Sequence, residues 1–405
     1  MTGGALLAGG GLLAGTRPRL LYPGAGPASL AEHTARYGPL PRGLRRPQRE
    51  ALIAEVGRAG LTGRGGAGFP TARKLAAVAA GHAPVVVANG TEGEPASAKD
   101  RVLMASSPHL VLDGAVLAAE LTRAREAVIV AHRDVREIMD EAAAERARAG
   151  LDRVRLVVGT AADGFVAGQA SAVVRWIQRG VPAPTATPPR LAQRGLHGAP
   201  TLVQNVETLA HLALIARYGT AWFRSAGTPA EPGTMLVTVA GAVRQPGVLE
   251  TGIGVPVGQV LEQAGGTSAP LRALLIGGYF GTWVDAAAAL GRPFSSAGLA
   301  DLDASPGAGL IAALPAGACG LRETARLARY LAGQSAGQCG PCRFGLPAIA
   351  GEVERLAAGQ DADAGLLRRW LGQVDGRGGC AHPDGAVRMI RSALRTFGTE
   401  LGGHR

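Results

Sequence analysis

The sequence predicts an α/β domain with a mostly parallel sheet, then a small α+β domain and a C-terminal four-helix bundle. Helical and strand patterns alternate over residues 46–230. Short strands around one helix replace them over residues 231–318, and four amphipathic segments occupy residues 319–405. Residues 1–45 show neither pattern and are expected to form a loose N-terminal arm.

The α/β prediction depends on apolar strand-like runs that are separated by helical patterns. Such alternation is typical of βαβ units, in which parallel strands are joined through helices. A proline-rich stretch interrupts the pattern late in the domain and is expected to be a loop. The expected segments are helix 47–59, strand 85–88, helix 109–123, strand 127–131, helix 134–149, strand 155–159 and loop 181–189.

In the second domain, residues 233–254 are expected to form two strands joined by a turn. Residues 255–266 should form a short helix, and residues 271–284 one further strand.

In the last domain, apolar side chains follow helical i, i+3, i+7 spacing, as in Leu346, Ile349 and Val353. Short loops between such helices favour an up-down bundle.

Composition limits the classes of function. The chain has 405 residues, a net charge of +11, 47% hydrophobic and 18% charged residues, which fits a soluble globular protein with an acidic partner or anionic ligand. Nucleic-acid binding is not expected, because the arginines are spread and only 4% of residues are aromatic. No apolar run approaches the about 18 residues that span a bilayer.

Residues 60–101 contain a glycine-rich loop, which is followed by a helical pattern with Lys74 and by a strand. Glycines allow several backbone N–H groups to approach an anion, and a lysine adds positive charge. The whole chain has only two lysines, Lys74 and Lys99, and both lie in this stretch. These features predict a phosphate-binding loop around Gly63, Arg64, Gly65, Gly66 and Gly68.

Three cysteines are expected to converge at one end of the bundle. Cys339 and Cys342 lie in its first loop and Cys380 in its third, and these loops share an end of an up-down bundle. Cys319 precedes the first helix and should lie about 20 Å away, at 1.5 Å per helical residue. The pattern favours an iron–sulfur cluster, with Cys3His zinc through His382 as the alternative.

Several motifs, in the same order, resemble the NADH-binding flavoprotein subunit of respiratory complex I and its relatives in hydrogenases and formate dehydrogenases. The resemblance covers about residues 45–400. The matching stretches are GRGGAGFPTARK (63–74), NGTEGEPASAKDR (89–101), GFVAGQASAV (164–173), GAPTLVQNVETLA (198–210) and SAGQCGPCRFG (335–345).

The resemblance implies an FMN-binding α/β domain, a ubiquitin-like β-grasp domain that binds soluble ligands, and a helical bundle that holds an iron–sulfur cluster. It places Phe69 against the nicotinamide nucleotide and implies no catalytic side chain, since hydride transfer to flavin requires none. Amide side chains suit flavin and ribityl oxygens. The implied FMN residues are Gly65, Gly66, Lys74, Asn89, Glu92, Gly168, Gln204, Asn205 and Thr208.

The chain departs from this family around the dinucleotide pocket. Thr91, Gln169 and Ala170 replace three carboxylates, while Ala77 and Arg190 replace two phenylalanines. The loss of acidic groups and the gain of an arginine favour a 2′-phosphate, so the sequence predicts NADPH use or relaxed specificity.

The cluster motif also departs, because Ala336 stands where the family has its first ligand cysteine. Three cysteines leave two alternatives, a three-iron cluster or a four-iron cluster with another fourth ligand. His382, two residues after Cys380, is the expected ligand on proximity in sequence.

The function that this resemblance implies is an NAD(P)H dehydrogenase subunit that passes electrons through FMN and the cluster to a protein such as a ferredoxin. Two alternatives are a relay module without nucleotide binding and a non-redox ligand-binding or scaffold protein. An acidic redox protein or neighbouring subunits are the expected partners, with no nucleic acid and no transmembrane segment. The expected location is the cytoplasm or the cytoplasmic face of a membrane complex.

Overall fold

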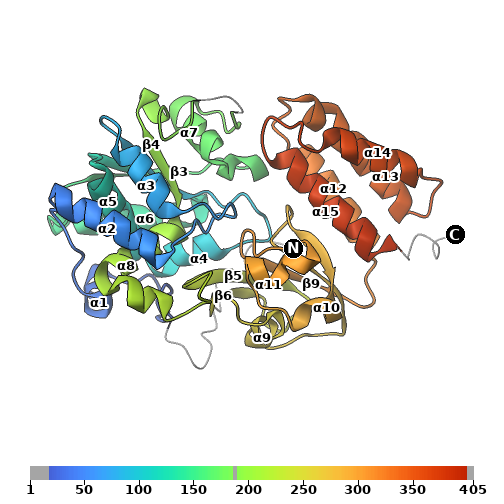
Figure 1. The fold of residues 1–405 in the computed structure, drawn as a ribbon, viewed down its shortest axis with the longest axis horizontal. Coiled ribbons are helices and arrows are strands. Elements are labelled where there is room, and N and C mark those ends of the chain that lie inside the picture. Colours follow the sequence, from blue (N-terminus) through green and yellow to red (C-terminus); the bar gives the residue numbers. More distant parts are fainter. Residues whose placement is uncertain (1–17, 186–188, 399–405) are drawn as a thin grey trace.

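The computed structural model describes residues 18–185 and 189–398 (Figure 1). The first domain is built on a four-stranded sheet in the order β3-β2-β1-β4, and every neighbouring pair is parallel. The predicted parallel α/β arrangement is therefore confirmed. The strands are β1 (Val85–Gly90), β2 (Glu126–Ala131), β3 (Arg155–Thr160) and β4 (Thr201–Asn205).

Helices cover both faces of this sheet, which explains why its strands are continuous apolar runs. Val86 and Ala88 of β1 point into the larger core with most of the helices, while Val87 packs on the opposite face with α7. The helices are α2 (Arg46–Ala59), α3 (Thr71–Ala79), α4 (Lys99–Ser106), α5 (Pro108–Thr122), α6 (Arg136–Arg148), α7 (Ala170–Arg179) and α8 (Val206–Arg224).

The order of the strands indicates where a ligand can bind. Strand β1 lies between β2 and β4, so the direction in which the chain adds strands reverses between β1 and β4, and the carboxyl ends of these two strands flank that point. Asn89 and Asn205 are direct partners across these two ends. Ligands of open α/β sheets bind in the crevice at such a point.

The N-terminal arm is not loose in its described part, and residues 1–17 lie outside the described residues. Leu20 is fully buried, and its N–H donates to the carboxylate of Glu250, 2.8 Å away in the second domain. Helix α1 (Leu30–Tyr37) follows, with a capping box at its start. The arm is held by its buried apolar residues and by the carboxylate of Glu250. Contacts of this kind leave no periodic pattern in the sequence, so they were not predicted.

The second domain contains a five-stranded mixed sheet in the order β6-β5-β9-β7-β8. The predicted single strand at 271–284 is wrong, because Gly277 and Gly278 have φ of +93° and +94° and turn the chain into a hairpin. Strand β9 was not predicted. The elements are β5 (Thr234–Gly241), β6 (Gly247–Gly252), α9 (Val257–Gln263), β7 (Leu271–Ile276), β8 (Thr282–Asp285), α10 (Ala286–Leu290), α11 (Ser296–Leu299) and β9 (Leu310–Pro315).

The C-terminal region is helical and lies at the end of the molecule opposite α1 and α2 (Figure 1). Its helices share one apolar core. It is anchored on the second domain through β8, where the N–H of Trp283 donates to the hydroxyl of Ser392 at 2.9 Å. The elements are α12 (Gly320–Gly333), a π-helical turn (Pro341–Gly345), α13 (Leu346–Ala357), α14 (Ala364–Val374) and α15 (His382–Thr396).

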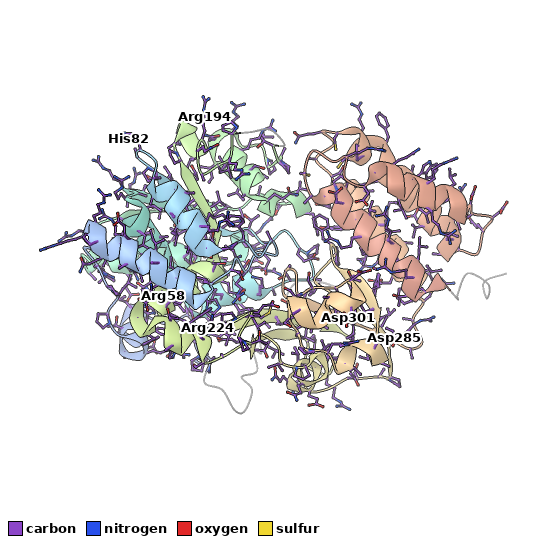
Figure 2. The ribbon with its side chains drawn as sticks, in the orientation of Figure 1. Arg58, His82, Arg194, Arg224, Asp285 and Asp301 are labelled. Atoms are coloured by element: carbon purple, nitrogen blue, oxygen red, sulfur yellow. The ribbon has the colours of Figure 1, made fainter. Side chains whose placement is uncertain are left out.

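Exposed charged side chains of both signs occur on the two sheet domains. Figure 2 shows Arg58 and Arg194 at separate edges of the first domain, and Asp285 and Asp301 on the second. Among the described residues, no single helix is long and apolar enough to cross a bilayer. Only α4 and α5 taken together meet that test, and they are bent by 98° relative to each other.

Candidate functional site

A cavity of about 810 Å³ opens where the two sheet domains and the helical region meet. This volume is typical of cofactor and substrate pockets. The α/β domain supplies the glycine-rich loop and the ends of β1 and β4. The second domain adds Phe280 and Asp303, and the helical region adds Ala381 and Arg388. Residues from all three parts of the chain therefore share one site.

Most of the predicted cofactor residues line this cavity. They come from the glycine-rich loop, from α3, from the two strand ends and from the segment before α7. The cavity-lining members of the predicted set are Gly63, Gly65, Gly66, Gly68, Phe69, Lys74, Asn89, Glu92, Gly168, Gln204 and Asn205.

Two predicted cofactor residues do not line the cavity. The backbone N–H of Arg64 donates to the Thr208 hydroxyl at 2.8 Å, which ties the glycine-rich loop to α8. The Arg64 guanidinium donates to the carbonyl of Pro232 at 3.2 Å, and burial lowers its pKa. Thr208 is fully buried. This pair holds the loop on the side away from the cavity, and a direct contact of either residue with the cofactor stays a prediction.

The glycine-rich loop has the backbone shape that the sequence predicted. Gly66 and Gly68 have φ of +99° and +60°, which side-chain-bearing residues rarely adopt. A Cβ on Gly65 would lie 3.4 Å from Asn205, so the loop runs close to the end of β4. A loop of this kind brings backbone N–H groups toward the cavity beside the start of α3.

Lys74 projects from α3 and lines the cavity. Its Nζ donates to the carbonyl of Val203 at 2.8 Å, and burial lowers the pKa of the ammonium. One hydrogen bond leaves further donors on the ammonium for an anion.

Lys74→Ala is expected to weaken FMN retention by about 1.5–3 kcal/mol, or roughly 10- to 150-fold, because a charge-assisted hydrogen bond to phosphate is lost. Flavin titration of the apoprotein measures the effect. Riboflavin, which has no phosphate, is the control ligand, and its affinity should change little. Full FMN retention by the variant would contradict the phosphate position at Lys74.

Glu92 lies at the cavity wall, but its carboxylate is already bound to other groups of the protein. It accepts from the Ser97 hydroxyl at 2.8 Å and from the N–H of Asp100 at 3.0 Å, and it pairs with Arg101 at 3.1 Å. A carboxylate at the first turn of α4 also interacts favourably with the helix dipole. Its clearest role is to fix the start of α4.

A buried ionic group that the predicted site did not include lies at the cavity wall. The Nζ of Lys99 is 2.8 Å from Asp100 and 2.8 Å from Glu207, and all three side chains are buried. Burial alone would lower the pKa of Lys99, but the two carboxylates outweigh it and raise that pKa. The signal for Lys99 was in the sequence, since it is one of only two lysines in the chain.

Several buried polar atoms at this cavity have no protein partner. They are Nε2 of Gln169, Oε1 of Gln204 and Oε1 of Glu94. Burial raises the pKa of Glu94 to about 7. Orphaned donors and acceptors in a cavity of this size fit a polar ring system such as a flavin, which offers both kinds of group. The residues present therefore fit FMN.

Two of the three predicted ligand cysteines, Cys339 and Cys342, interact with each other, and the Cys380 sulfur is near enough to raise the pKa of Cys342. Burial alone would raise the pKa of Cys339, but the backbone N–H groups of Gly379 and Cys342 leave it below its ordinary value. Burial raises the pKa of Cys342 to about 12, and the Cys339 and Cys380 sulfurs add to the increase. The convergence of all three cysteines on one cluster stays a prediction.

This thiol group suits a cluster better than a single ion. Within residues 18–185 and 189–398, no three His, Cys, Asp or Glu side chains are placed to hold one metal ion. Zinc needs its ligands around one centre, whereas a cluster spreads its thiolates over different irons. Amides that donate to Cys339 are the kind of contact that stabilises cluster sulfurs.

Cys319 and His382 lie apart from the three thiols. Cys319 caps the start of α12, with its sulfur 3.4 Å from the N–H of Arg322, one helix length from the loop of Cys339. The Nε2 of His382 bonds the Leu331 carbonyl at 2.8 Å, and its Nδ1 is buried without a partner. No contact of the described residues joins His382 to a cysteine, and its role as a ligand stays a prediction.

Three family models match the chain. The Nuo51 FMN-binding domain matches residues 56–214, the SLBB domain residues 236–275, and the iron–sulfur binding region of NADH-ubiquinone oxidoreductase-F residues 322–404. These matches confirm the coarse order of an FMN domain, an SLBB domain and an iron–sulfur region.

Similar curated proteins share most of the chain. The NADH-quinone oxidoreductase F subunit of Streptomyces coelicolor is 31% identical over 372 residues, which are 87% of this chain and 82% of that protein. The corresponding protein of Mycobacterium tuberculosis (strain ATCC 25618 / H37Rv), which has the same name, is 30% identical over 389 residues, 91% and 87% of the two chains.

A solved structure, the NAD+-reducing [NiFe]-hydrogenase in the H2-reduced state, matches with a TM-score of 0.81 and 32% identity. The match covers 88% of this chain but only 63% of the hydrogenase chain. From these motifs, the fold and the matches to whole relatives, we conclude that the chain belongs to the family of NADH-quinone oxidoreductase F subunits, the FMN- and iron–sulfur-binding flavoproteins.

Proposed function

We propose that this protein oxidises NAD(P)H at FMN in the cavity and passes electrons through an iron–sulfur cluster at Cys339, Cys342 and Cys380 to a protein acceptor. FMN supplies the link between a two-electron donor and one-electron carriers. The glycine-rich loop and Lys74 would hold the phosphate, and Asn89, Gln169 and Gln204 would face the polar edges of the flavin.

One observation carries this proposal. Ala381 lines the cavity, and Cys380, its neighbour in the chain, belongs to the thiol group. The cavity that would hold the flavin thus extends to the residue next to Cys380. Phe165 and Phe280 fill the same wall, with ring centroids 4.7 Å apart. Such closeness is what direct electron transfer requires.

The test is an anaerobic reconstitution of the full chain with FMN, iron and sulfide, followed by titration with NADH and NADPH. Bleaching of the flavin band together with an EPR signal from the reduced cluster would support the proposal. Flavin and cluster that both load, but that neither nucleotide reduces, would favour the relay function. A chain that loads neither group would favour the non-redox ligand-binding or scaffold function.

The nucleotide is expected to be NADPH, or either nucleotide with little preference. Gln169 and Ala170 line the cavity where the family carries two glutamates, so less negative charge opposes a 2′-phosphate. Arg190 is exposed and is not among the cavity-lining residues, so it adds little support. Steady-state reduction of ferricyanide with each nucleotide is the measurement. Gln169→Glu with Ala170→Glu should shift kcat/KM toward NADH, and a strong NADH preference of the unaltered chain would contradict the argument.

The acceptor is proposed to be an acidic redox protein that docks at the cluster loops. Phe344, in the π-helical turn after Cys342, is 70% exposed, and the Arg343 guanidinium lies 5.7 Å from its ring centroid. Arg377, in the opposite loop, is also exposed. In the described part of the chain, neither arginine pairs with a carboxylate, so both charges are open to a partner.

Arg343→Gln with Arg377→Gln is expected to slow NAD(P)H-driven reduction of an acidic ferredoxin severalfold at low salt, with less effect at high salt. Ferricyanide reduction should not change. Arg58→Gln, an exposed change on α2 at a distance from these loops (Figure 2), is the matched control. If the double variant and the control reduce ferredoxin at equal rates, the proposal that the acceptor docks at Arg343 and Arg377 is wrong.

For the finer architecture, we propose a β-grasp fold for the second domain and an up-down four-helix bundle for α12–α15. The mixed sheet packed on α9 supports the β-grasp fold, and the shared apolar core of the four helices supports the bundle.

We also place the protein in the cytoplasm as a subunit of a redox complex. Similar proteins are named as subunits, and none of the four cysteines is in a disulfide.

A further inference from the structure

The cavity has a positively charged side chain at its rim that the proposed FMN site does not use. Among the described residues, the cations that line the cavity are Lys74, Lys99 and Arg388. Lys74 is partly buried beside the glycine-rich loop, and Lys99 lies between two buried carboxylates. Arg388, which belongs to α15 of the helical region, is exposed. It is therefore the lining cation that is most accessible to a ligand that enters from solvent.

One face of α15 is directed at this cavity. Ala381 and Arg388 both line it, and they lie seven residues apart, which is about two helical turns. Gly385 lies between them on the same face. A Cβ on Gly385 would overlap the ring of Phe280, so the glycine allows this ring to pack directly on the helix. The contact holds α15 against the turn between β7 and β8.

The same turn orients the Arg388 side chain. Its Nη1 donates to the carbonyl of Phe280 at 3.2 Å. A guanidinium carries five N–H donors in a planar fork, so this bond leaves several of them for a ligand. A neutral carbonyl also leaves the positive charge in place. The guanidinium is thus held at the cavity wall and remains able to bind an anion.

No carboxylate within residues 18–185 and 189–398 forms an ion pair with Arg388. The other two arginines of α15 are paired, Arg391 with Asp375 and Arg395 with Asp303 at 3.2 Å. Asp303 itself lines the cavity, but its charge is balanced by Arg395. The positive charge of Arg388 is therefore left for an anionic ligand of the cavity.

The wall beside Arg388 lacks negative charge at two positions that also line the cavity. The ring of Phe280 packs on that of Phe165, with centroids 4.7 Å apart. Phe165 begins the short helical turn that ends directly before Gln169 and Ala170. A single pair of packed rings thus connects the cation with these two uncharged side chains. Such a wall favours the additional phosphate by which NADPH differs from NADH.

We propose that Arg388 binds the 2′-phosphate of NADPH and determines the nucleotide preference of this chain. The inference rests on the proposed function, because it takes a nicotinamide nucleotide as a ligand of the cavity. The guanidinium would donate two parallel hydrogen bonds to phosphate oxygens, while the Phe280 carbonyl keeps its own donor. NADH has a hydroxyl at this position, so it would leave the guanidinium without an anionic partner.

The test is calorimetric titration of the full FMN-loaded chain with NADP+ and NAD+. Adenosine 2′,5′-bisphosphate and 5′-AMP serve as probes without nicotinamide. Arg388→Gln should weaken binding of NADP+ and of the bisphosphate about 10-fold or more at low salt, with little change for NAD+ and AMP. Arg388→Lys keeps the charge but not the fork, so it should lose less. Because Arg388 is exposed, these differences should shrink at high salt.

Arg391→Gln is the matched control, since Arg391 lies on the same helix, is already paired with Asp375 and does not line the cavity. It should bind NADP+ as tightly as the unaltered chain does. Unchanged NADP+ affinity in Arg388→Gln would overturn the inference. An equal loss for NAD+ and NADP+ would also overturn it, because Arg388 would then contact the pyrophosphate that both nucleotides share.

Reduction of the flavin by NADH in the same samples tests the proposed function separately. It should continue in Arg388→Gln, because NADH has no 2′-phosphate. Flavin reduction by both nucleotides together with unchanged NADP+ affinity in Arg388→Gln would refute only the role of Arg388. An unaltered chain that binds neither nucleotide and whose flavin neither reduces would refute the proposed function as well.

Discussion

Replacement of Cys339, Cys342 or Cys380 by serine is expected to remove most of the iron, while FMN stays bound. Each cysteine would hold a different iron, and a hydroxyl replaces a thiolate ligand poorly. The flavin residues lie on the other wall of the cavity, so NAD(P)H should still bleach the flavin. Iron analysis, the flavin spectrum and EPR of the reduced protein measure the three effects separately.

Cys319→Ser is the matched control for these variants. Its sulfur caps α12 at the end of the helix that lies away from Cys339, so iron content should stay that of the unaltered chain. Iron loss from Cys319→Ser, or full iron in any of the three loop variants, would show that the ligand set is different. The loop variants should also stop electron flow to a protein acceptor, while ferricyanide reduction continues.

Motifs that act within one short segment could be predicted from the sequence. The glycine-rich loop needs positive φ at Gly66 and Gly68, and only glycine does this readily, so the pattern itself encodes the shape. The convergence of Cys339 with Cys380 was expected from the helix count and the short loops of an up-down bundle, and it stays a prediction. For the glycine-rich loop, local backbone geometry alone determines the shape.

Residues that reach the site from another domain could not be predicted in this way. Phe280 and Arg388 line the cavity only because the second domain and the helical region fold back onto the first. Nothing in their local sequence differs from an ordinary turn or helix face. By contrast, the hairpin at Gly277-Gly278 had a turn signal, which an apolar run on both sides obscured.

The described arm depends on a long-range contact of the same kind, whereas Glu92 is held by partners five to nine residues further along the chain. Leu20 is held by a carboxylate 230 positions further along the chain, which no periodicity can indicate. Glu92 was expected to contact the flavin, but its carboxylate accepts hydrogen bonds from three neighbouring residues, Ser97, Asp100 and Arg101. Sequence patterns identify which residues cluster, but hydrogen-bond partners decide which of them remain open to a ligand.

Lys99→Met is expected to destabilise the protein by about 3–5 kcal/mol at neutral pH, the usual cost when one partner of a buried ionic group is removed. Two carboxylates, Asp100 and Glu207, would remain buried without their cation. Glu207 also accepts from the N–H of Leu236 at 2.9 Å, so the contact between the first two domains would weaken. Urea unfolding of the apoprotein measures the loss.

The effect should depend on pH. Burial already raises the pKa of Asp100 and of Glu207, and removal of the ammonium raises both further. A carboxyl whose pKa is higher in the folded state stabilises the fold below its unfolded pKa, and this stability is lost as pH rises. The loss of unfolding free energy in Lys99→Met should therefore be smaller at pH 5 than at pH 7.5. The addition of Glu207→Gln should recover part of this free energy at pH 7.5.

Arg46→Met, which removes an exposed ion pair on α2, is the control and should change stability little. A Lys99→Met protein as stable as this control would show that the buried group contributes no more than a surface pair.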